Sequence, residues 1–356
     1  MVGRDPVEAA GQSAEMLLPA ASVVAPLAPL PDAPRLLVVV LNPSTGRFTA
    51  NELLRLLEHE LGTSYALHLI ETSPEHDTTA AVRAIADAAA VVLVCGGDGT
   101  VNAVASGLIG HPTPLAILPG GTTNIIAQGL GIPADPLAVC QILRGDALTV
   151  ALDVAQIGEH FLLHMGGAGY DAHLMGMTNR AAKRGFGLGA YLVFGARGLL
   201  DQPIVDFTIR IDGRTIHERG WMALVANGSD VFTRGLRLGP HISTTDGMLD
   251  LVLFTAPGFL DAAVSFLSIL VRRYRSPYLR YERGRQIEIH ADPPLPVEFD
   301  GDPVGTTPFI AEVLPAALNV LVPLPGNGRQ IGPWLRRNLA NLLPSPGAAT
   351  VFPAEY

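Results

Sequence analysis

The sequence contains an aspartate inside a glycine turn, Gly96-Gly97-Asp98-Gly99-Thr100. A run of β-branched residues precedes this turn and a helix-like pattern follows it, which predicts a buried strand that ends where a helix begins. Glycines let a backbone approach an anion closely, and the first turn of a helix has free N–H groups. Because a carboxylate would repel a bare phosphate, Asp98 favours a magnesium–nucleotide as the ligand. The alternative is a structural turn whose aspartate only caps the helix.

Two further polar turns follow predicted strands in the same way. Residues 42–46 (NPSTG) follow an apolar run that ends at Leu41, and residues 119–124 (PGGTTN) follow a second one. In an open α/β sheet, ligands bind at the edge where the carboxyl ends of the strands meet. Three such turns would supply amides and hydroxyls around the phosphates of a nucleotide. The single lysine, Lys183, is not in a Gly-Lys-Ser/Thr sequence, which excludes a Walker-type loop.

The elements around these turns alternate between strand and helix. Short β-branched runs are typical of buried strands, and apolar residues at helical spacing are typical of amphipathic helices. This alternation predicts an α/β domain over residues 35–146, with a doubly wound parallel sheet that binds a nucleotide. The predicted strands are 36–41, 64–72, 91–94 and 114–119, and the predicted helices are 50–61, 78–89, 102–109 and 124–130.

After about residue 147 the pattern becomes strand-rich. It predicts a second, β-rich and sandwich-like domain at 147–324 that binds the substrate. The Asp-Gly pair at 212–213 is typical of a tight hairpin, and residues 258–274 have the one helical pattern of this half. The predicted strands are 148–158, 160–169, 204–213, 221–229, 248–255, 285–291 and 295–302.

The ends and the composition limit the class of protein. Residues 1–34 predict a flexible leader rich in alanine and proline, and residues 325–356 predict a tail with a short amphipathic helix. A net charge of −9 does not favour nucleic-acid binding. Cys95 and Cys140 lie in apolar segments and predict free thiols in a reducing compartment. Because the chain has no apolar run that could span a bilayer and no signal-peptide pattern, we expect a cytoplasmic protein.

The three turns, in their order and spacing, resemble the diacylglycerol kinase catalytic-domain family of lipid kinases. That family includes sphingosine and ceramide kinases and the bacterial soluble diacylglycerol kinases. The carrying motifs are NPSTG, GGDGTVNAV and LPGGTTN, followed in the β-rich half by GGAGYDAHL, TTDGMLDLVL and VEFDGDPVG. The resemblance covers about residues 35–324. GGDGT alone is shared with NAD kinases and phosphofructokinases, whereas LPGGTTN followed by DGMLD and DGD distinguishes the lipid kinases.

The resemblance implies ATP as co-substrate and Mg²⁺ as cofactor. Asp98 would orient the magnesium-bound phosphates, and catalysis would consist mostly of positioning and charge stabilisation. The residues expected around ATP are Asn42, Pro43, Ser44, Thr45, Gly46, Thr72, Gly96, Gly97, Asp98, Gly99, Thr100, Val101, Asn102 and Thr122.

The resemblance also implies a catalytic base and a metal loop. The family has an Asp-Gly-Glu motif near the end of its β-rich domain, and this chain has Asp300-Gly301-Asp302 instead. We take Asp302 as the base and Asp300 as its support, although the two roles could be exchanged. The segment 243–250 (STTDGMLD) is similar to the family's structural magnesium loop. There Asp246, the carbonyl of Met248 and Ser243 would be ligands.

An unusually basic segment predicts a contact with a membrane. Residues 272–285 contain six arginines and three tyrosines in a chain of net charge −9. Arginine with interleaved tyrosine suits an anionic bilayer surface. Single-stranded nucleic acid is an alternative that the family resemblance disfavours, and a solvated loop with salt bridges is the structural alternative.

These observations predict a cytoplasmic, peripherally membrane-associated enzyme. Its expected reaction is the ATP- and Mg²⁺-dependent phosphorylation of a membrane lipid, most simply of diacylglycerol to phosphatidic acid. A sphingoid-base or ceramide kinase, an NAD kinase and a nucleotide- or lipid-binding regulator without activity are the alternatives. No nucleic-acid partner is expected, and a homodimer stays open.

Overall fold

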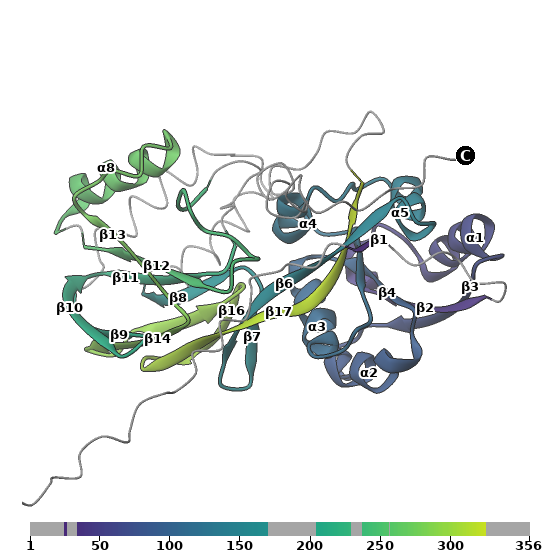
Figure 1. The fold of residues 1–356 in the computed structure, drawn as a ribbon, viewed down its shortest axis with the longest axis horizontal. Helices are drawn as coiled ribbons and strands as arrows, with labels where there is room; N and C mark the ends of the chain where they lie inside the picture. Colours follow the sequence, from purple (N-terminus) through teal and green to yellow (C-terminus); the bar gives the residue numbers. More distant parts are fainter. Residues whose placement is uncertain (1–24, 27–33, 170–203, 229–236, 256, 325–356) are drawn as a thin grey trace, which may run out of the picture.

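The computed structural model describes residues 25–26, 34–169, 204–228, 237–255 and 257–324, and these form an α/β half and a β-rich half (Figure 1). The predicted tail helix lies outside the described residues, as does the predicted leader except for Ala25–Pro26 (β1) and residue 34.

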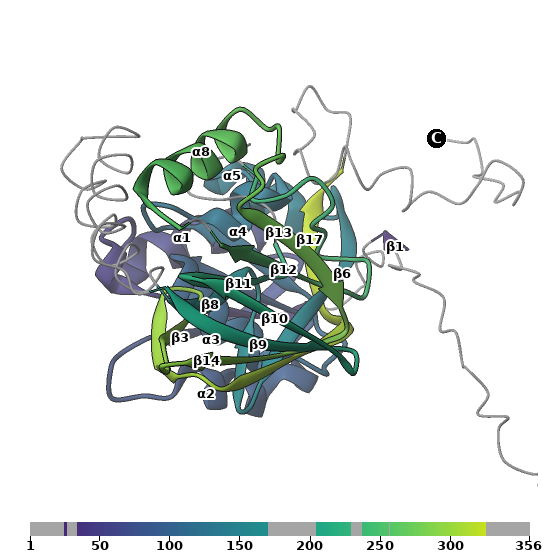
Figure 2. The same cartoon turned by 90° about the vertical axis from the view of Figure 1, so that its left-hand side faces the viewer.

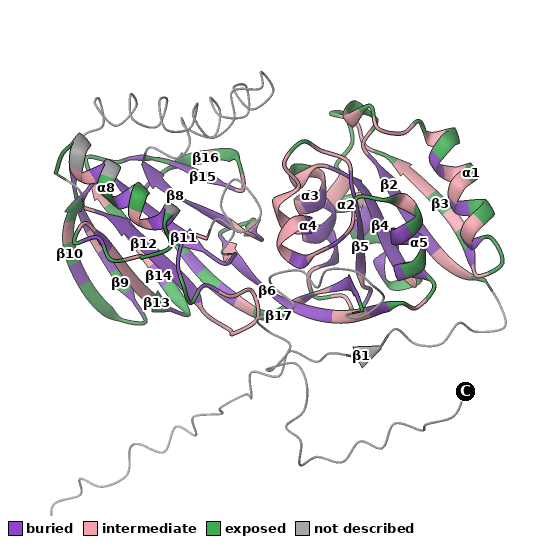
Figure 3. Cartoon of the chain, turned by 90° about the horizontal axis from the view of Figure 1, so that it is seen from above, coloured by how far each residue is buried: buried purple, intermediate pink, exposed green. Residues whose placement is uncertain are grey.

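The sheet of the α/β half is parallel. Its strands stand side by side in the order β3-β2-β4-β5, so the chain order is 2-1-3-4. Every residue of β4 and β5 is buried, because helices cover both faces of the sheet (Figure 3). The predicted doubly wound sheet is confirmed. The strands are β2 (Arg35–Leu41), β3 (Tyr65–Glu71), β4 (Val91–Gly96) and β5 (Leu115–Pro119).

Helices pack on the two faces through separate apolar clusters. On one face, α1 buries Leu53, Leu57 and Leu61 against β2 and β4, together with α5. On the other face, α2, α3 and α4 pack against the opposite side chains of the same strands. The helices are α1 (Ala50–Leu61), α2 (Thr78–Ile85), α3 (Asp98–Leu108), α4 (Ile125–Leu130) and α5 (Pro136–Leu143), with short 3₁₀ turns at Pro43–Thr45 and Ala86–Ala88.

Helix α5 was absent from the predicted elements. Its start carries a recognisable signal, since Asp135 accepts hydrogen bonds from the N–H groups of Leu137 and Ala138 and Pro136 occupies the first turn.

The β-rich half is a sandwich of two sheets, as predicted. One sheet continues the parallel sheet of the α/β half beyond β5, in the order β17-β14-β9-β10. The other sheet has the order β13-β12-β11-β8-β15-β16. Their facing side chains form one core, which includes Phe207, Val225 and Phe299. Figure 2 shows α8 (Phe259–Leu270) on the outer side of the second sheet, where Ala262 and Ile269 are buried.

The strands of this half follow the predicted pattern with several additions. The predicted hairpin at residues 212–213 joins β9 to β10. The strands are β6 (Ala147–Ile157), β7 (His160–Leu162), β8 (Met165–Gly169), β9 (Val205–Ile211), β10 (Arg214–Gly220), β11 (Met222–Ala226), β12 (Leu249–Phe254), β13 (Leu279–Gly284), β14 (Gln286–Asp292), β15 (Pro296–Phe299), β16 (Asp302–Thr306) and β17 (Phe309–Pro323).

Two long strands, β6 and β17, join the halves (Figure 1). β17 pairs with β14 in the sandwich near its start and runs parallel to β5 at Val320 near its end. Its pairing with β6 shifts register between Leu314 and Leu318, and Ala316 has φ 51° there. Pro315 lies inside this bulge, which is why the segment does not look like a continuous strand in the sequence.

Candidate active site

A cleft of ≈ 470 Å³ lies at the carboxyl edge of the parallel sheet. It brings together residues from all the predicted nucleotide-binding segments except the loop after β5. Thr78 and Ala103 also line it and were not predicted. The predicted residues that line it are Asn42, Ser44, Thr45, Thr72, Gly97, Gly99 and Thr100.

Hydrogen bonds hold the first strand's turn against α3. Asn42 donates from Nδ2 to Thr100 Oγ1 at 2.8 Å, and its Oδ1 accepts from the N–H of Ser44 at 3.0 Å. At the N-cap of α3, Gly97 contributes no side-chain hydrogen bond. The N–H groups of the first turn therefore keep their capacity for an anion in the cleft.

Glycine is needed in the loops after β4 and β5 for close packing, whereas Gly99 has open space around it. A Cβ on Gly121 would lie 2.7 Å from Gly97 Cα, and the N–H of Gly120 donates to Gly96 O at 2.7 Å. These glycines allow the loops after β4 and β5 to touch. By contrast, a Cβ on Gly99 would meet nothing within 4 Å, and Gly99 lines the cleft.

Asp98 caps a helix, but not the one it begins. Its Oδ1 accepts from the N–H of Ile126 at 3.3 Å, in the first turn of α4. Asn124, the N-cap of α4, instead uses its side chain to bond with both backbone groups of Gly121. Asp98 is half-buried beside the nucleotide cleft, where its carboxylate suits a cation on the phosphates.

The remaining predicted nucleotide residues lie near the cleft without lining it. Val101 is buried in the core, whereas Pro43, Gly46 and Thr122 are exposed. Arg47 was missed, and its guanidinium donates to the carbonyls of Pro119 and Ala134, which ties the first turn to the third.

Asp300 is a half-buried carboxylate whose two oxygens are surrounded by N–H donors. Its Oδ1 accepts from the N–H groups of His164 and Met165, both at 3.1 Å. Its Oδ2 accepts from the N–H of Leu163 at 2.8 Å and from Asn102 Nδ2 at 3.2 Å. These bonds explain why the predicted single strand 160–169 is instead two strands, since three consecutive N–H groups turn toward one side chain.

The environment of Asp300 moves its titration toward neutral pH. Burial raises the pKa of this carboxyl to about 7, and the nearby charge of Asp98 also raises it. The hydrogen bonds from Leu163, Met165 and His164 act in the opposite direction, because they favour the ionised form.

Asp302 lies two residues further, across an Asp-Gly turn in which Asp300 and Gly301 have φ 48° and 97°. It is exposed and lines a second, polar cleft of ≈ 670 Å³. This cleft shares Gly99 and Ala103 with the nucleotide cleft. The two clefts therefore meet at the start of α3, and Asp302 lines the second of them. The other lining residues are Asp77, Thr79, Arg83, Asn102, Ser106, Glu159, His160, Phe161, Phe299 and Val304.

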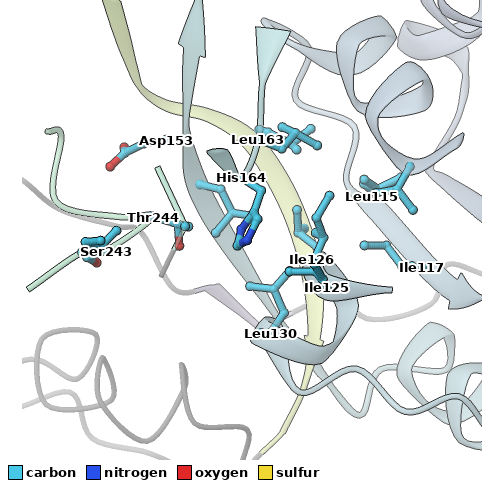
Figure 4. A pocket seen from close by; sticks show the side chains of 17 residues that line it. Leu115, Ile117, Ile125, Ile126, Leu130, Asp153, Leu163, His164, Ser243 and Thr244 are labelled. Atoms are coloured by element: carbon cyan, nitrogen blue, oxygen red, sulfur yellow. The ribbon is translucent and has the colours of Figure 1, made fainter. Parts of the chain in front are cut away.

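A small apolar cavity lies between the halves. Figure 4 shows His164 among side chains of β5 and α4, with Asp153 and Ser243 on the other side. Its volume of ≈ 40 Å³ has room for very few water molecules and not for an acyl chain.

Two of the three predicted metal ligands, Asp246 and Ser243, have their side-chain oxygens engaged with protein groups. Asp246 accepts from the N–H of Met248 at 3.2 Å and from the guanidinium of Arg283. Ser243 Oγ lies 3.3 Å from Thr245 Oγ1. In the part of the chain that the structure describes, no three His, Cys, Asp or Glu side chains form a group suited to a metal ion.

The basic segment 272–285 divides into two parts. Arg280 of β13 pairs with Glu218 of β10 and with Glu282 of its own strand, and Arg283 pairs with Asp246. Arg272, Arg273 and Arg275, which follow α8, are exposed.

Comparison with known proteins agrees with this architecture. The model of the diacylglycerol kinase catalytic domain matches residues 36–157, and the model of the YegS C-terminal NAD kinase beta sandwich-like domain matches residues 165–322. The chain is 29% identical over 301 residues to lipid kinase YegS of Escherichia coli K12, covering 82% of this chain and 96% of that protein. It is 27% identical over 311 residues to the uncharacterized protein sll0036 of Synechocystis, covering 80% and 70%.

A solved structure of a diacylglycerol kinase from Bacillus anthracis has the same fold. It superposes with a TM-score of 0.65 at 22% identity and covers 81% of this chain and 97% of its own. The chain belongs to the diacylglycerol kinase catalytic-domain family. It is a lipid kinase, a phosphotransferase with an alcohol group as acceptor.

Two alanine substitutions should distinguish a glycine needed for close packing, Gly121, from one that lines the cleft, Gly99. We expect Gly121→Ala to lower the free energy of unfolding by about 1–3 kcal/mol, because its Cβ would press on the backbone of Gly97. Gly99→Ala should keep or slightly raise stability, since helix α3 gains an alanine. It should weaken ATP binding, because the new Cβ enters the nucleotide cleft. Denaturant unfolding and calorimetric ATP titration measure both effects, and unchanged ATP affinity in Gly99→Ala would contradict this placement.

Asp300→Asn should destabilise the protein, because in either orientation the amide NH₂ faces N–H donors. We expect a loss of about 1–3 kcal/mol. The pH dependence follows from the raised pKa: the contribution of Asp300 is complete below its ordinary value of 3.8 and is lost as pH rises through about 7. The stability difference between wild type and Asp300→Asn should therefore shrink by roughly 2 kcal/mol between pH 5 and pH 8. Urea unfolding at both pH values measures it, and a difference independent of pH would show that the pKa is not raised.

Proposed function

We propose that this lipid kinase transfers the γ-phosphoryl group of ATP to the free hydroxyl of diacylglycerol and so forms phosphatidic acid. The observation that carries the proposal is the meeting of the two clefts at Gly99 and Ala103. A phosphate held over the first turn of α3 would lie between a nucleotide on one side and an acceptor hydroxyl on the other. Phosphoryl transfer requires this in-line arrangement and little covalent work by the protein.

The nucleotide side is supported by its groups. The uncapped first turn of α3 offers N–H groups to phosphate oxygens, and the hydroxyls of Thr45, Thr72 and Thr100 line the same cleft. Asp98 would hold Mg²⁺ through its carboxylate. When bound, Mg²⁺ neutralises charge on the phosphates.

For the base, position and pKa favour different residues. The pKa of Asp300, near 7, suits proton transfer at neutral pH. However, both of its oxygens already accept N–H hydrogen bonds inside the protein. Asp302 is exposed on the acceptor cleft. Because a base must first reach the hydroxyl, we assign proton removal to Asp302 and the positioning of its turn to Asp300.

Asp302→Asn should lower kcat by about 10²–10⁴-fold with little change in stability, because the proton acceptor is lost from an exposed position. Glu159→Gln is the matched control, since it removes another carboxylate of the same cleft and should keep most activity. Transfer from labelled ATP to a panel of lipids in mixed micelles, with Mg²⁺ or chelator, measures both variants.

The outcome of that panel also tests the acceptor. If sphingoid base or ceramide is labelled and phosphatidic acid is not formed, the substrate is that lipid and not diacylglycerol. If NAD is labelled instead, the proposal of a lipid acceptor is contradicted. Full turnover by Asp302→Asn would assign the base to another group.

We also propose that α8 and the residues after it contact an anionic membrane surface. Val264, Leu267 and Val271 are 53%, 56% and 52% exposed, which is unusual for three apolar side chains at helical spacing. Exposed arginines 272, 273 and 275 follow directly. Apolar side chains beside arginines suit the boundary between headgroups and acyl chains. Within the described residues, no helix combines the length and apolar character needed to cross a bilayer.

Replacing Arg272, Arg273 and Arg275 together by Gln should weaken binding to vesicles that contain phosphatidylserine. At about 1 kcal/mol per arginine, the expected loss is on the order of 100-fold. The control, with the same change of net charge, replaces Arg210, Arg214 and Arg219, which lie on β9 and β10 of the other sheet and pair with Glu288, Glu282 and Asp206. Vesicle co-sedimentation measures both, and equal losses in the two variants would place the membrane contact elsewhere.

A further inference from the structure

Three carboxylates surround the loop between residue 243 and β12. Asp153 of β6 and Asp250 of β12 are 4% and 7% exposed, and Asp246 lies in the loop between them in space. Such a group needs cationic or N–H partners, because buried carboxylates without them are strongly unfavourable.

Backbone N–H groups satisfy only one of the three fully. Asp153 accepts from the N–H of Gly247 at 2.7 Å and from that of Ala316 at 2.9 Å. Asp246 has one backbone partner, the N–H of Met248. For Asp250, Oδ2 is buried and has no hydrogen-bond partner among the described residues. The backbone therefore leaves a need for positive charge beside Asp246 and Asp250.

The guanidinium of Arg283 lies at that position. β12 and β13 pair so that Arg283 stands directly opposite Asp250. Its Nη2 donates to Asp246 Oδ2 and to the carbonyl of His241, and its Nε lies 3.4 Å from Asp250 Oδ1. One planar cation thus contacts the loop before Ser243, the loop itself and the strand that follows. Guanidinium suits this geometry because its donors diverge in a rigid fork.

A divalent cation would compete with these contacts. Mg²⁺ requires near-octahedral oxygen ligands at about 2.0–2.1 Å. Both oxygens of Asp246, the central predicted ligand, already accept hydrogen bonds. The residues present therefore fit an organic cation better than a metal ion.

We propose that Arg283 is the built-in cation of this loop, so that the segment 243–250 folds without a divalent ion. The proposal concerns only the loop and is independent of Mg²⁺ carried by the nucleotide.

The test measures melting temperature without nucleotide, in EDTA and in millimolar Mg²⁺. The wild type should melt at the same temperature in both. Arg283→Met should melt roughly 10 °C lower in EDTA, because it leaves buried carboxylates unpaired. Mg²⁺ should restore part of that loss, since the vacated position now attracts a cation.

Two further variants keep the test decisive. Arg210→Met removes an exposed arginine paired with Glu288 on the neighbouring sheet, and it should shift melting by no more than about 2 °C, with no response to Mg²⁺. If Arg283→Met does not fold, Arg283→Lys keeps the charge but loses the divergent donors of guanidinium, and it should show a smaller loss and a weaker Mg²⁺ response because the ammonium still occupies the position. A wild-type stabilisation by Mg²⁺ that Asp246→Asn abolishes would overturn the proposal. So would equal losses in Arg283→Met and Arg210→Met.

Discussion

The half-buried carboxylate of Asp300 determines the geometry of the proposed acceptor cleft. Four N–H donors converge on it, from the corner between β7 and β8 and from Asn102 of α3. It therefore joins the sandwich to the helix that forms the nucleotide site. Asp302 follows one glycine later in the same tight turn, so its place on the cleft depends on the same hydrogen bonds. Without these donors, the loss of solvation at this position would be uncompensated.

The proposed nucleotide side depends on close packing of backbone together with a few side-chain hydrogen bonds. Gly97 and Gly121 bring two loops into contact, and Arg47 ties the first turn to the third. The halves are then held in register by β6 and β17, which belong to both. One continuous sheet runs through both halves. It fixes the proposed donor and acceptor clefts relative to each other, so that both include Gly99 at the start of α3.

Arginine performs distinct tasks in a chain that has one lysine. Arg283 neutralises buried carboxylates, Arg280 joins acids at the surface of β13, and arginines 272, 273 and 275 remain exposed after α8. The same basic segment is therefore partly engaged in ion pairs between strands and partly exposed at the surface. The planar guanidinium has several donors that point in different directions, which allows Arg283 and Arg280 each to contact more than one acceptor.

The sequence by itself determined the alternation of strands and helices, the three turns of the nucleotide site and the family, because local periodicity and glycine positions encode them. It also indicated the carboxylate pair, but only the tertiary structure separated Asp300, which is enclosed by distant N–H groups, from Asp302, which is exposed. β17 was hidden by its bulge at Pro315, and the partners of Arg283 by the pairing of β12 with β13. These features arise from contacts between residues far apart in the chain, which a local pattern does not contain.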